Sequence, residues 1–564
     1  MPKVIGIGKQ RYDRIIENNL FYIDKTMFIK EWWENQDDVT LITRPRRFGK
    51  TLNMDMLKCF FSNEYKDRGD LFEGLDIWKE EKYREIQGTY PVIFLSFAKI
   101  KQNTYEDAIA GIKRIICDEI QKYIFLKDWD GLADEEKNNL KNITYGMDDV
   151  TAQEAIASLS NYLSRYYGKN VIILLDEYDT PMQEAYVNGY WEELVSFTRS
   201  FFNATFKSNL YLERAVITGI TSVSKESIFS DLNNLKVITV ESDEYSDTFG
   251  FSEEEVFLAL DDFNLSDKKQ IVKEWYDGFT FGSQRDIYNP WSIINFLENK
   301  KIDTYWADTS SNSLINHLIK KSVPEIKELM ELLLKRESIE VTFDDQIVFN
   351  QLDKSKNAIW SLLVASGYLK IDDIEYKGLL LKPWYHISIT NLETVSMFAN
   401  MFAGWFENPD ARYNDFIKSL LNNDLKGMNY YMNKVALATF SYFDTGKNPS
   451  ETLEPERFYH GFVLGLIVEL SDRYEVKSNR ESGFGRYDVM IIPLNKSEKA
   501  IVLEFKVHEN DEEKTLEETV SSALAQIEEK KYDTELINAG VKKENIRHYG
   551  FAFEGKKVLI GTDE

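Results

Sequence analysis

Short runs of apolar residues alternate with stretches of helical periodicity through the first half of the chain. The runs predict buried strands at Val39–Thr43, Val92–Phe97, Val171–Leu175 and Ala215–Thr218. Between the second and third runs, apolar residues recur at helical spacing from Tyr105 to Phe125. Strands that alternate with helices are typical of a parallel sheet covered by helices. The pattern therefore predicts an α/β domain over residues 1–298.

The middle of the chain has a mostly helical pattern. Residues Ala358–Asp373 predict a helix that runs into a strand, and Tyr376–Ile389 predicts a hairpin. This combination resembles a winged helix. The turn-forming residues Gly446–Pro449 are typical of a linker. We therefore predict a helical and winged-helix-like region over residues 299–450.

Strand-like runs return after this linker. Two of them, Tyr487–Leu494 and Ala500–Val507, are followed by a helical pattern around Thr519–Lys531. An apolar helix is expected before them, at Phe458–Leu470. The sequence thus predicts a last α/β domain over residues 451–564.

Charge narrows the classes of function. The chain has 564 residues, with 68 Lys and Arg against 94 Asp and Glu, and hence a net charge of −26. This excludes a protein that coats nucleic acid by bulk positive charge, so nucleic acid would have to meet a local basic groove. Hydrophobic residues make up 43% of the chain and aromatic residues 14%, which excludes a disordered chain.

The cysteines and the apolar runs bear on location. Cys59 and Cys117 are the two cysteines, and neither has a metal-binding spacing, which favours a reducing compartment. No apolar run approaches the roughly 18 residues of a membrane span. We therefore expect a cytoplasmic protein that does not associate with a membrane.

A phosphate-binding loop is predicted where the first strand ends. There the sequence runs Arg44-Pro45-Arg46-Arg47-Phe48-Gly49-Lys50-Thr51 into an apolar-faced helix, the context in which backbone amides converge on phosphate. Lys50 would bind the β and γ phosphates of ATP and Thr51 would ligate Mg²⁺, while Arg46, Arg47, Phe48 and Gly49 would complete the loop. The loop is a degenerate Walker A, because Arg44 replaces the usual first glycine and Pro45 has no N–H to donate. A solvated basic turn is the alternative.

A second motif supports the first. The strand Val171–Leu175 ends in Asp176-Glu177-Tyr178-Asp179, the form of a Walker B. Asp176 would hold the water shell of Mg²⁺, and Glu177 would orient or deprotonate the attacking water. Solvated acids at a strand end are the alternative, which we prefer for Asp179. At the tip of another strand, Thr218 or Thr221 would sense the γ phosphate. Together the motifs predict ATP binding, with hydrolysis as a further step.

The last domain carries candidate nuclease chemistry. Alternation along a strand puts Glu504 and Lys506 on one face and Leu503 and Phe505 on the other. If the two runs pair as a hairpin, Asp488 reaches the polar face. Charged residues inside so apolar a strand are costly unless they are paired or bind metal. We therefore expect Asp488 and Glu504 to bind Mg²⁺, or alternatively Mn²⁺, and Lys506 to position or deprotonate water or to stabilise the charge on phosphate.

Neighbouring residues extend this site. Glu456 is a candidate further metal ligand, and Gln526 on the later helix would steady the site. Four basic residues and two acidic ones lie between Arg473 and Arg486, a local positive excess. The alternative is an edge-strand salt bridge between Glu504 and Lys506 on a solvated face.

These motifs together resemble the AAA-ATPase-like family that carries a carboxy-terminal PD-(D/E)xK nuclease domain, found in bacteria and some archaea. The resemblance rests on Phe21–Thr26, Arg44–Thr51, Leu175–Pro181, Ser227–Asn234, Trp275–Gly278, Tyr288–Trp291, Ser478–Arg486 and Leu503–Lys506. It implies a P-loop NTPase parallel sheet, then the winged-helix-like region, then a restriction-endonuclease-like α/β domain. Basic residues in place of the first Walker glycine look like a family trait.

Two functions are compatible with these observations. The first is an ATP-dependent or ATP-regulated, Mg²⁺-requiring nuclease that acts on nucleic acid, with DNA favoured, in genome defence or mobile-element biology by analogy. The second is an ATP-dependent switch or scaffold whose nuclease-like domain binds nucleic acid or a protein partner without cleaving it. Oligomerisation is left open.

Overall fold

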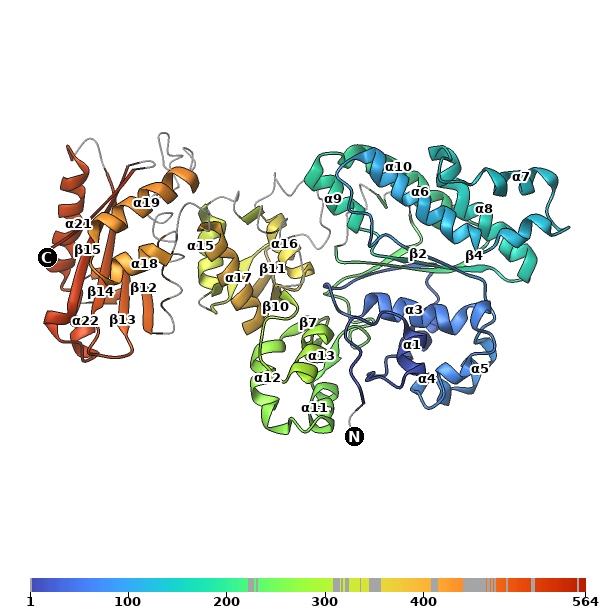
Figure 1. Cartoon of the computed structure of the whole chain (residues 1–564), viewed down its shortest axis with the longest axis horizontal. Helices are drawn as coiled ribbons and strands as arrows, with labels where there is room; N and C mark the ends of the chain where they lie inside the picture. The colour runs from blue at the N-terminus through green and yellow to red at the C-terminus, as the bar shows by residue number, and fades with distance from the viewer. Residues whose placement is uncertain are drawn as a thin grey trace. The chain divides into compact units, whose positions relative to one another are not determined.

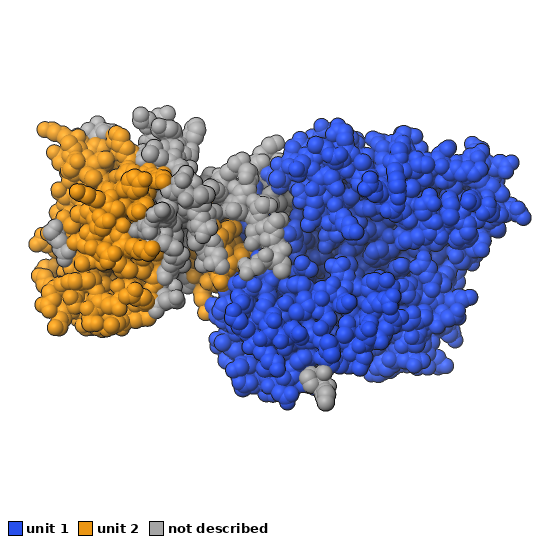
Figure 2. All heavy atoms as spheres, viewed as in Figure 1, with its two compact units in different colours: residues 1–318, 338–394 blue, residues 319–337, 395–564 orange. Residues whose placement is uncertain are grey.

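In the computed structural model, the chain folds into two compact units (Figure 2). One comprises Met1–Leu318 with Ser338–Thr394, and the other Ile319–Glu337 with Val395–Glu564. The structure describes residues 3–221, 228–229, 232–307, 315, 318–319, 324–334, 336–343, 357–406, 414–439, 463, 467, 470, 473–482, 485–508, 513–554 and 557–563. The domain boundaries predicted at residues 298 and 450 stay predictions of the sequence.

The first unit is built on a five-stranded parallel sheet, as predicted. Its strand order is β2-β3-β4-β1-β5, and all neighbouring pairs are parallel. The strands are β1 (Val39–Thr43), β2 (Val92–Ser96), β3 (Val171–Asp176), β4 (Leu212–Gly219) and β5 (Leu235–Ile238). The four predicted strands are confirmed, and β5 was not predicted. Because these strands are parallel, the loops after β1, β3 and β4 emerge at the same edge of the sheet, and because β4 lies between β1 and β3, these loops are neighbours.

Helices cover both faces of this sheet (Figure 1). On one face lie α6 (Tyr105–Gln121), α8 (Asp149–Tyr167) and α10 (Trp191–Phe202), and on the other α1 (Tyr12–Glu17) and α3 (Lys50–Phe61). The other helices before the middle region are α2 (Met27–Asn35), α4 (Asp76–Lys79), α5 (Glu81–Ile86), α7 (Asp134–Asn142), α9 (Thr180–Asn188), α11 (Glu253–Asp262), α12 (Lys269–Tyr276) and α13 (Pro290–Asn299). The predicted helix from Tyr105 is confirmed as α6, whose N-terminus is capped by Thr104.

Two small antiparallel sheets complete the first unit. One has the order β6-β8-β7, formed by Phe251–Ser252, Gln284–Tyr288 and Phe279–Phe281. The other has the order β10-β11-β9, formed by Leu369–Lys377, Lys382–Ile389 and Ile339–Val341. With α16 (Ala358–Ala365) before β10, the second sheet has the predicted helix, strand and hairpin of the winged-helix-like region.

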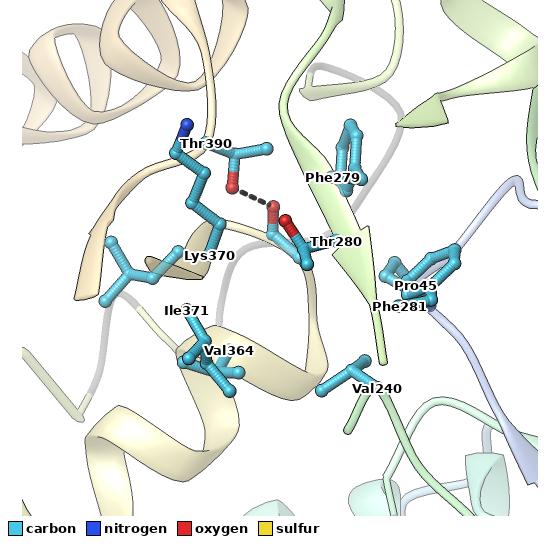
Figure 3. Close-up of a pocket in the computed structure, with 11 residues that line it drawn as sticks. Pro45, Val240, Phe279, Thr280, Phe281, Val364, Lys370, Ile371 and Thr390 are labelled. Carbon is cyan, nitrogen blue, oxygen red and sulfur yellow. Dashed lines mark hydrogen bonds between the residues drawn. The ribbon is translucent and has the colours of Figure 1, made fainter. Parts of the chain in front are cut away.

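The turn between α16 and β10 packs directly against Pro45 of the predicted phosphate loop, Arg44–Thr51 (Figure 3). Gly367 has a φ of +81°, and a Cβ at this position would lie 2.8 Å from Pro45 Cγ. Thr390 holds the turn, since its hydroxyl donates a hydrogen bond of 2.8 Å to the carbonyl of Gly367. Close approach as well as the left-handed backbone therefore require glycine here.

The second unit contains a five-stranded mixed sheet of order β12-β13-β14-β15-β16. Its elements are α15 (Pro324–Leu334), α18 (Asn414–Leu421), α19 (Leu425–Thr439), β12 (Tyr474–Ser482), β13 (Gly485–Pro493), β14 (Ala500–Val507), α21 (Leu516–Lys530), α22 (Asp533–Asn538), β15 (Ile546–Glu554) and β16 (Lys557–Thr562). Helix α17 (Leu392–Phe406) begins in the first unit and continues into the second. Strand β14 is parallel to β15, and the other pairs are antiparallel. The predicted strand Ala500–Val507 is confirmed at both ends.

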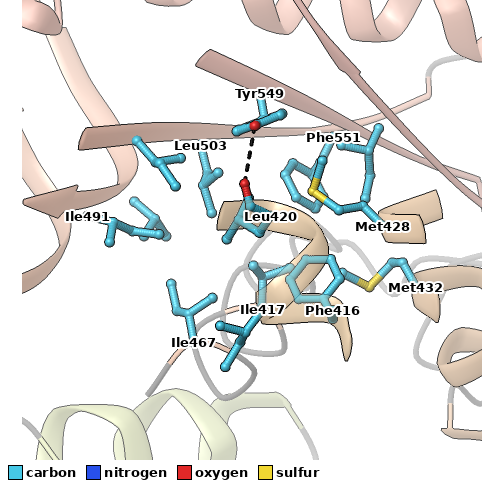
Figure 4. Packing of buried hydrophobic residues seen from close by; sticks show 14 of the residues in the cluster. Phe416, Ile417, Leu420, Met428, Met432, Ile467, Ile491, Leu503, Tyr549 and Phe551 are labelled. Atoms are coloured by element: carbon cyan, nitrogen blue, oxygen red, sulfur yellow. Dashed lines mark hydrogen bonds between the residues drawn. The ribbon is translucent and has the colours of Figure 1, made fainter. Parts of the chain in front are cut away.

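Alternate side chains of β13 and β14 point to opposite faces of the sheet and pack into two hydrophobic cores. On one face Ile491 and Leu503 pack against α18 and α19, which contribute Phe416, Leu420, Met428 and Met432 (Figure 4). On the other face Met490 and Val502 pack with Ile527 of α21 and Leu536 of α22. Residues 488 and 504 have the same parity as this second set, so the candidate nuclease residues lie on the α21 face.

Candidate functional site

The phosphate loop surrounds the ammonium group of Lys50. Its Nζ donates hydrogen bonds of 2.9 and 2.8 Å to the carbonyls of Arg44 and Pro45. The loop turns at Arg47 and Gly49, which have φ values of +66° and +79°. Burial lowers the pKa of Lys50, although nearby carboxylates, Glu177 foremost, favour its charged form. A buried cation at a helix N-terminus is the arrangement that binds phosphate.

Arg44 does not point into this loop. Its guanidinium is buried and donates to the carbonyls of Thr43 and Thr239 at 3.0 and 2.7 Å. It also lies over the ring of Phe281, 4.5 Å from the centroid. Burial lowers the pKa of Arg44 to about 9. Arg44 therefore anchors the predicted phosphate loop to the surrounding protein, a role that the sequence did not reveal.

The remaining residues of the loop differ in their contacts. Arg46 donates to Gln183 Oε1 at 3.3 Å, and the exposed Arg47 lies over the ring of Trp291 at 4.4 Å. Phe48 is only 1% exposed and packs against the rings of Phe279 and Phe281. We infer that the side chain of Phe48 holds the loop in place and that a ligand meets the two arginines.

Asp176 lies between two hydroxyl groups. Thr51 Oγ1 donates to Asp176 Oδ2 at 2.7 Å, and Thr218 Oγ1 donates to Asp176 Oδ1 at 2.6 Å. Burial raises the pKa of Asp176, and the two hydroxyl bonds counteract this. A hydroxyl and a carboxylate oxygen side by side are hard donors, which fit Mg²⁺. The hydroxyl of Thr218 is used to hold Asp176, and its role as a sensor stays a prediction.

The other two acids after β3 have different environments. Glu177 has a φ of +52°, an unfavourable backbone conformation for a residue with a side chain, and lines the cavity. Asp179 is fully buried, and its Oδ2 accepts from the backbone N–H groups of Ile220 and Thr221 at 3.0 and 2.9 Å. Asp179 is therefore held by the backbone that follows β4, and the expectation that it is a solvated acid is wrong.

The phosphate loop opens into a cavity of about 390 Å³. Among the described residues, Glu177 is the one acid that lines it, and Lys25, one of the basic residues there, is paired with Glu255. The basic residues that line it are Lys9, Lys25, Arg46, Arg47, Lys50 and Lys101. Apolar side chains that include Phe21, Ile23 and Trp291 line it as well. Its size is that of a cavity for a cofactor-sized ligand. An excess of cations in the wall, within a chain of net charge −26, favours a polyphosphate ligand.

The N-terminus of helix α13 forms part of the wall of this cavity. No function was predicted for this segment from the sequence. Asn289 caps α13 by accepting from Trp291 N at 2.9 Å, and its Nδ2 donates to the carbonyl of Arg46 at 3.3 Å. Pro290 and Trp291 line the cavity. A helix start is visible in the Asn-Pro pair, since Asn is a good N-cap and Pro suits the first helical position.

A buried carboxylate supports the same helix. Glu393 accepts from Ser292 Oγ at 2.8 Å and from the backbone N–H groups of Tyr305 and Trp306 at 2.6 Å each. Burial raises the pKa of Glu393 to about 7, against these hydrogen bonds. Sequence pattern did not single out Glu393, because a lone Glu in an apolar helix carries no spacing signal.

In the second unit, Asp488 and Glu504 lie side by side. The register Val489↔Leu503 between antiparallel β13 and β14 places them on adjacent strands. Asp488 Oδ2 accepts from the backbone N–H of Phe505 at 2.8 Å. Glu504 is 3% exposed and accepts from Gln526 Nε2 of α21. Two carboxylates at one place are hard oxygen donors, which fit Mg²⁺ or Mn²⁺.

Tyr532 lies beside Gln526, close to the carboxylates of Asp488 and Glu504. Gln526 Nε2 also donates to the hydroxyl of Tyr532 at 3.3 Å. Burial, together with the charges of Glu504 and Asp488, raises the pKa of Tyr532 to about 12. The phenol therefore stays protonated and neutral near the two carboxylates at neutral pH.

Lys506 differs from Glu504 in its contacts. It is partly exposed and makes no hydrogen bond or ion pair with the residues that the structure describes. Strand β14 lies in the centre of the sheet, with Glu504 buried. The alternative of an edge-strand salt bridge on a solvated face is therefore wrong. Glu456 lies outside the described residues.

The predicted local basic excess is reduced by ion pairs. Arg473 pairs with Glu498 at 2.9 Å and Lys477 with Glu535 at 3.0 Å. Lys506 has no acidic partner among the residues that the structure describes.

None of the helices in the described part of the chain combines the length and the apolar character that a membrane crossing requires.

A parallel sheet with a lysine-bearing loop and a strand-end Asp, followed by a sheet with a carboxylate pair, defines the class of an ATPase-like protein joined to a nuclease-like domain. Comparison with known families agrees. Residues 6–229 match the family described as predicted AAA-ATPase, and residues 454–563 match the PD-(D/E)XK nuclease superfamily. The chain therefore carries an AAA-ATPase-like domain followed by a PD-(D/E)XK nuclease superfamily domain, as the sequence motifs indicated.

Two individual proteins are similar to this chain. An uncharacterized protein in the vnfD 5′ region of Azotobacter chroococcum mcd 1 is 25% identical over 504 residues, covering 87% of each chain. A crystal structure of a signal transduction ATPase with numerous domains (STAND), with a tetratricopeptide repeat sensor, from Pyrococcus horikoshii is 12% identical. That match covers 83% of this chain and 54% of the other, with a TM-score of 0.23.

Proposed function

We propose that this protein binds ATP in its first unit and uses the bound nucleotide to control a metal-dependent nuclease, acting on DNA, in its second. The cavity around Lys50 carries the first half of the proposal, because basic residues outnumber acidic ones in its described wall even with Lys25 paired to Glu255, which suits a polyphosphate. Asp488 of β13, with Glu504 and Lys506 of the neighbouring central strand β14 on the same face of the sheet, carries the second half.

Each residue of the nucleotide site has a role in this proposal. Lys50 holds the β and γ phosphates as a point charge, and Arg46 and Arg47 bind the remaining phosphate oxygens. Thr51 and Asp176 hold Mg²⁺, which when bound supplies neutralisation of phosphate charge. Glu177 orients the attacking water, and its strained backbone directs it to the cavity.

The nuclease site has a matching division of roles. Asp488 and Glu504 hold Mg²⁺ or Mn²⁺, which when bound supplies a Lewis acid for phosphate. Gln526 orients Glu504 through a hydrogen bond. Lys506, free of acidic partners among the described residues, contacts the phosphate or the attacking water.

The decisive experiment is a cleavage assay with the whole chain. Supercoiled plasmid and linear duplex are incubated with Mg²⁺ or Mn²⁺, with and without ATP, beside the matched variant Glu504→Gln. We expect metal-dependent cleavage by the parent protein, a change of rate with ATP, and loss of cleavage in the variant. Absence of cleavage under every condition would contradict the nuclease half of the proposal.

A switch or scaffold is the second candidate, and one observation favours it. Arg44 and Pro45 are held by the surrounding protein, and Pro45 offers no N–H to phosphate. This loop therefore suits slow turnover and a persistent ATP-bound state. Tight ATP and DNA binding with neither hydrolysis nor cleavage would favour the switch.

We further propose a cytoplasmic location and a part in genome defence or mobile-element biology. Cys59 and Cys117 are buried free thiols, as a reducing compartment favours. Phage plating on cells that carry the parent gene or the Glu504→Gln variant tests the role in defence. Protection by the parent alone is expected. Equal plating on both strains would contradict that role.

A further inference from the structure

We propose that His508 is a further substrate-contacting residue of the nuclease strand, with its Nε2 donating a hydrogen bond to a backbone phosphate of the bound DNA. This inference rests on the proposed nuclease function and adds a residue to it. No sequence motif indicated His508, because it follows the end of the predicted strand. It nevertheless continues the alternation of polar residues that begins with Glu504 and Lys506.

The backbone places His508 on the same face as Glu504 and Lys506. Although β14 ends at Val507, the backbone N–H of His508 donates to the carbonyl of Phe553 at 2.8 Å, which continues the pairing with β15. Side chains two residues apart on a strand point the same way, about 6.6 Å from one another. Lys506 and His508 can therefore meet successive positions along one nucleic-acid strand.

Helix α21 confirms this placement independently. Its Gln526 contacts Glu504, and its Thr519, two turns earlier, contacts His508. The helix thus runs antiparallel to β14 and covers both ends of the polar face. Residues seven apart share one side of a helix, so a single face of α21 holds Glu504 and His508.

Hydrogen bonds fix which nitrogen of His508 is available. Thr519 Oγ1 has one hydrogen, which it donates to the carboxylate of Glu513. Its lone pair then accepts from His508 Nδ1–H, at 2.8 Å. Glu513 Oε2 also lies 3.5 Å from Nδ1. Nδ1 is therefore committed to the protein, and only Nε2 is left for a ligand.

The environment of Nε2 points to a ligand. The side chain of His508 is 5% exposed, yet Nε2 makes no hydrogen bond with any residue in the described part of the chain. A histidine that only tied β14 to α21 would need no more than the Thr519 contact. Here Glu513 and Thr519 act in series to orient one ring, which is how proteins fix an imidazole that must meet a second partner.

The test measures DNA affinity with the whole chain, using a fluorescent duplex and Ca²⁺ in place of Mg²⁺. We expect His508→Leu to weaken binding about tenfold, the value of one charge-assisted hydrogen bond. His508→Gln keeps a donor near the position of Nε2 and should recover most of that loss. His386→Leu, at a half-buried histidine of the first unit, is the matched control and should bind like the parent.

A phosphate scan separates contact from stability. Neutral methylphosphonates are placed one at a time along each strand of the duplex. One position should weaken binding by the parent and have no further effect on His508→Leu, which is the pattern of a direct partner in a mutant cycle. Thr519→Val should reduce, without abolishing, the effect at that same position.

Three results would overturn the proposal. One is parent-like affinity of His508→Leu. Another is an equal effect of every methylphosphonate on the parent and on His508→Leu. The last is loss of amide protection in α21 of His508→Leu and His508→Gln alike, together with loss of binding, which would make His508 a structural tie. A parent protein that neither binds nor cleaves DNA would instead overturn the proposed nuclease function, and this inference with it.

Discussion

Thr51 donates a hydrogen bond of 2.7 Å to Asp176, which lies 125 residues further along the chain. The strand order brings them together, because β4 alone separates β1 from β3 and their carboxyl ends meet at one edge of the sheet. Thr218, at the end of β4, holds the second oxygen of Asp176. The neighbouring strands β3, β4 and β1 thus bring three polar side chains together. Asp176 and Thr218 lie at the ends of β3 and β4, and Thr51 follows the loop after β1.

Lys50→Ala should abolish ATP binding and leave the fold intact. The change removes the buried charge at the centre of the phosphate loop, and we expect a loss of affinity of at least about 100-fold. Isothermal titration of ATP measures it. Lys82→Ala, at an exposed lysine paired with Glu34, is the control and should bind like the parent. Unchanged affinity in Lys50→Ala would refute the phosphate-loop assignment.

Glu177→Gln and Asp176→Ala should separate hydrolysis from metal-dependent binding. Glu177→Gln keeps the side-chain shape but loses the base, so it should bind ATP and hydrolyse it about 100-fold more slowly. Asp176→Ala removes a hard oxygen and leaves the hydroxyls of Thr51 and Thr218 without their acceptor, so Mg²⁺-dependent binding should weaken as well. Phosphate release and ATP titration with and without Mg²⁺ measure both effects. Parent-like hydrolysis by Glu177→Gln would mean that another group orients the water.

Lys506→Ala should lose DNA cleavage while retaining metal binding, whereas Asp488→Ala and Glu504→Ala should lose both. The reason is that the two acids are the proposed ligands, and Lys506 is proposed to act on phosphate or water. Since Lys506 has no ion pair among the described residues, its removal should cost little stability, within the about 0 to 1 kcal/mol of an exposed pair. Cleavage rate, Mn²⁺ titration and melting temperature are compared across the three variants. Normal cleavage by Lys506→Ala would exclude its role.

His548 should make the stability of the second unit depend on pH. Its Nε2 lies 2.7 Å from Asp533 Oδ1 and its Nδ1 lies 2.5 Å from Asp563 Oδ2. Burial alone would lower the pKa of His548, but hydrogen bonds with Asp533 and Asp563 outweigh it and raise the pKa from 6.5 to about 9. Because the folded pKa exceeds the unfolded one, the stabilisation is complete below about pH 6.5 and is lost as pH rises through about 9.

Hydrogen exchange of β15 amides, corrected for intrinsic rates, measures this effect. Protection in the parent should fall between pH 6.5 and 9, and His548→Gln should be less protected at pH 6.5 and nearly independent of pH. An identical pH dependence in parent and variant would show that other groups control it.

The local sequence pattern predicted the positions of helices and strands better than the contacts that they make in the folded protein. The strands at Val39–Thr43 and Ala500–Val507 agree with the structure at both ends, because a continuous apolar run bounded by polar residues is a local signal. Strand β5 was missed, since Leu235–Ile238 is only four residues long and half of it is partly exposed. The burial of Asp179 was also missed, because its partners Ile220 and Thr221 follow a different strand.

By itself, the sequence determined that a lysine-bearing loop follows a buried strand and that Glu504 and Lys506 share a strand face, since loop composition and side-chain alternation are properties of neighbouring residues. Only the tertiary structure decided that Arg44 turns away from the loop and that Asp176 meets Thr51. It also decided that β14 is a central strand and that His508 faces α21. These features depend on strand order and on the packing of distant helices. Periodicity along the chain does not encode either, because the same local pattern is compatible with several orders of the same strands.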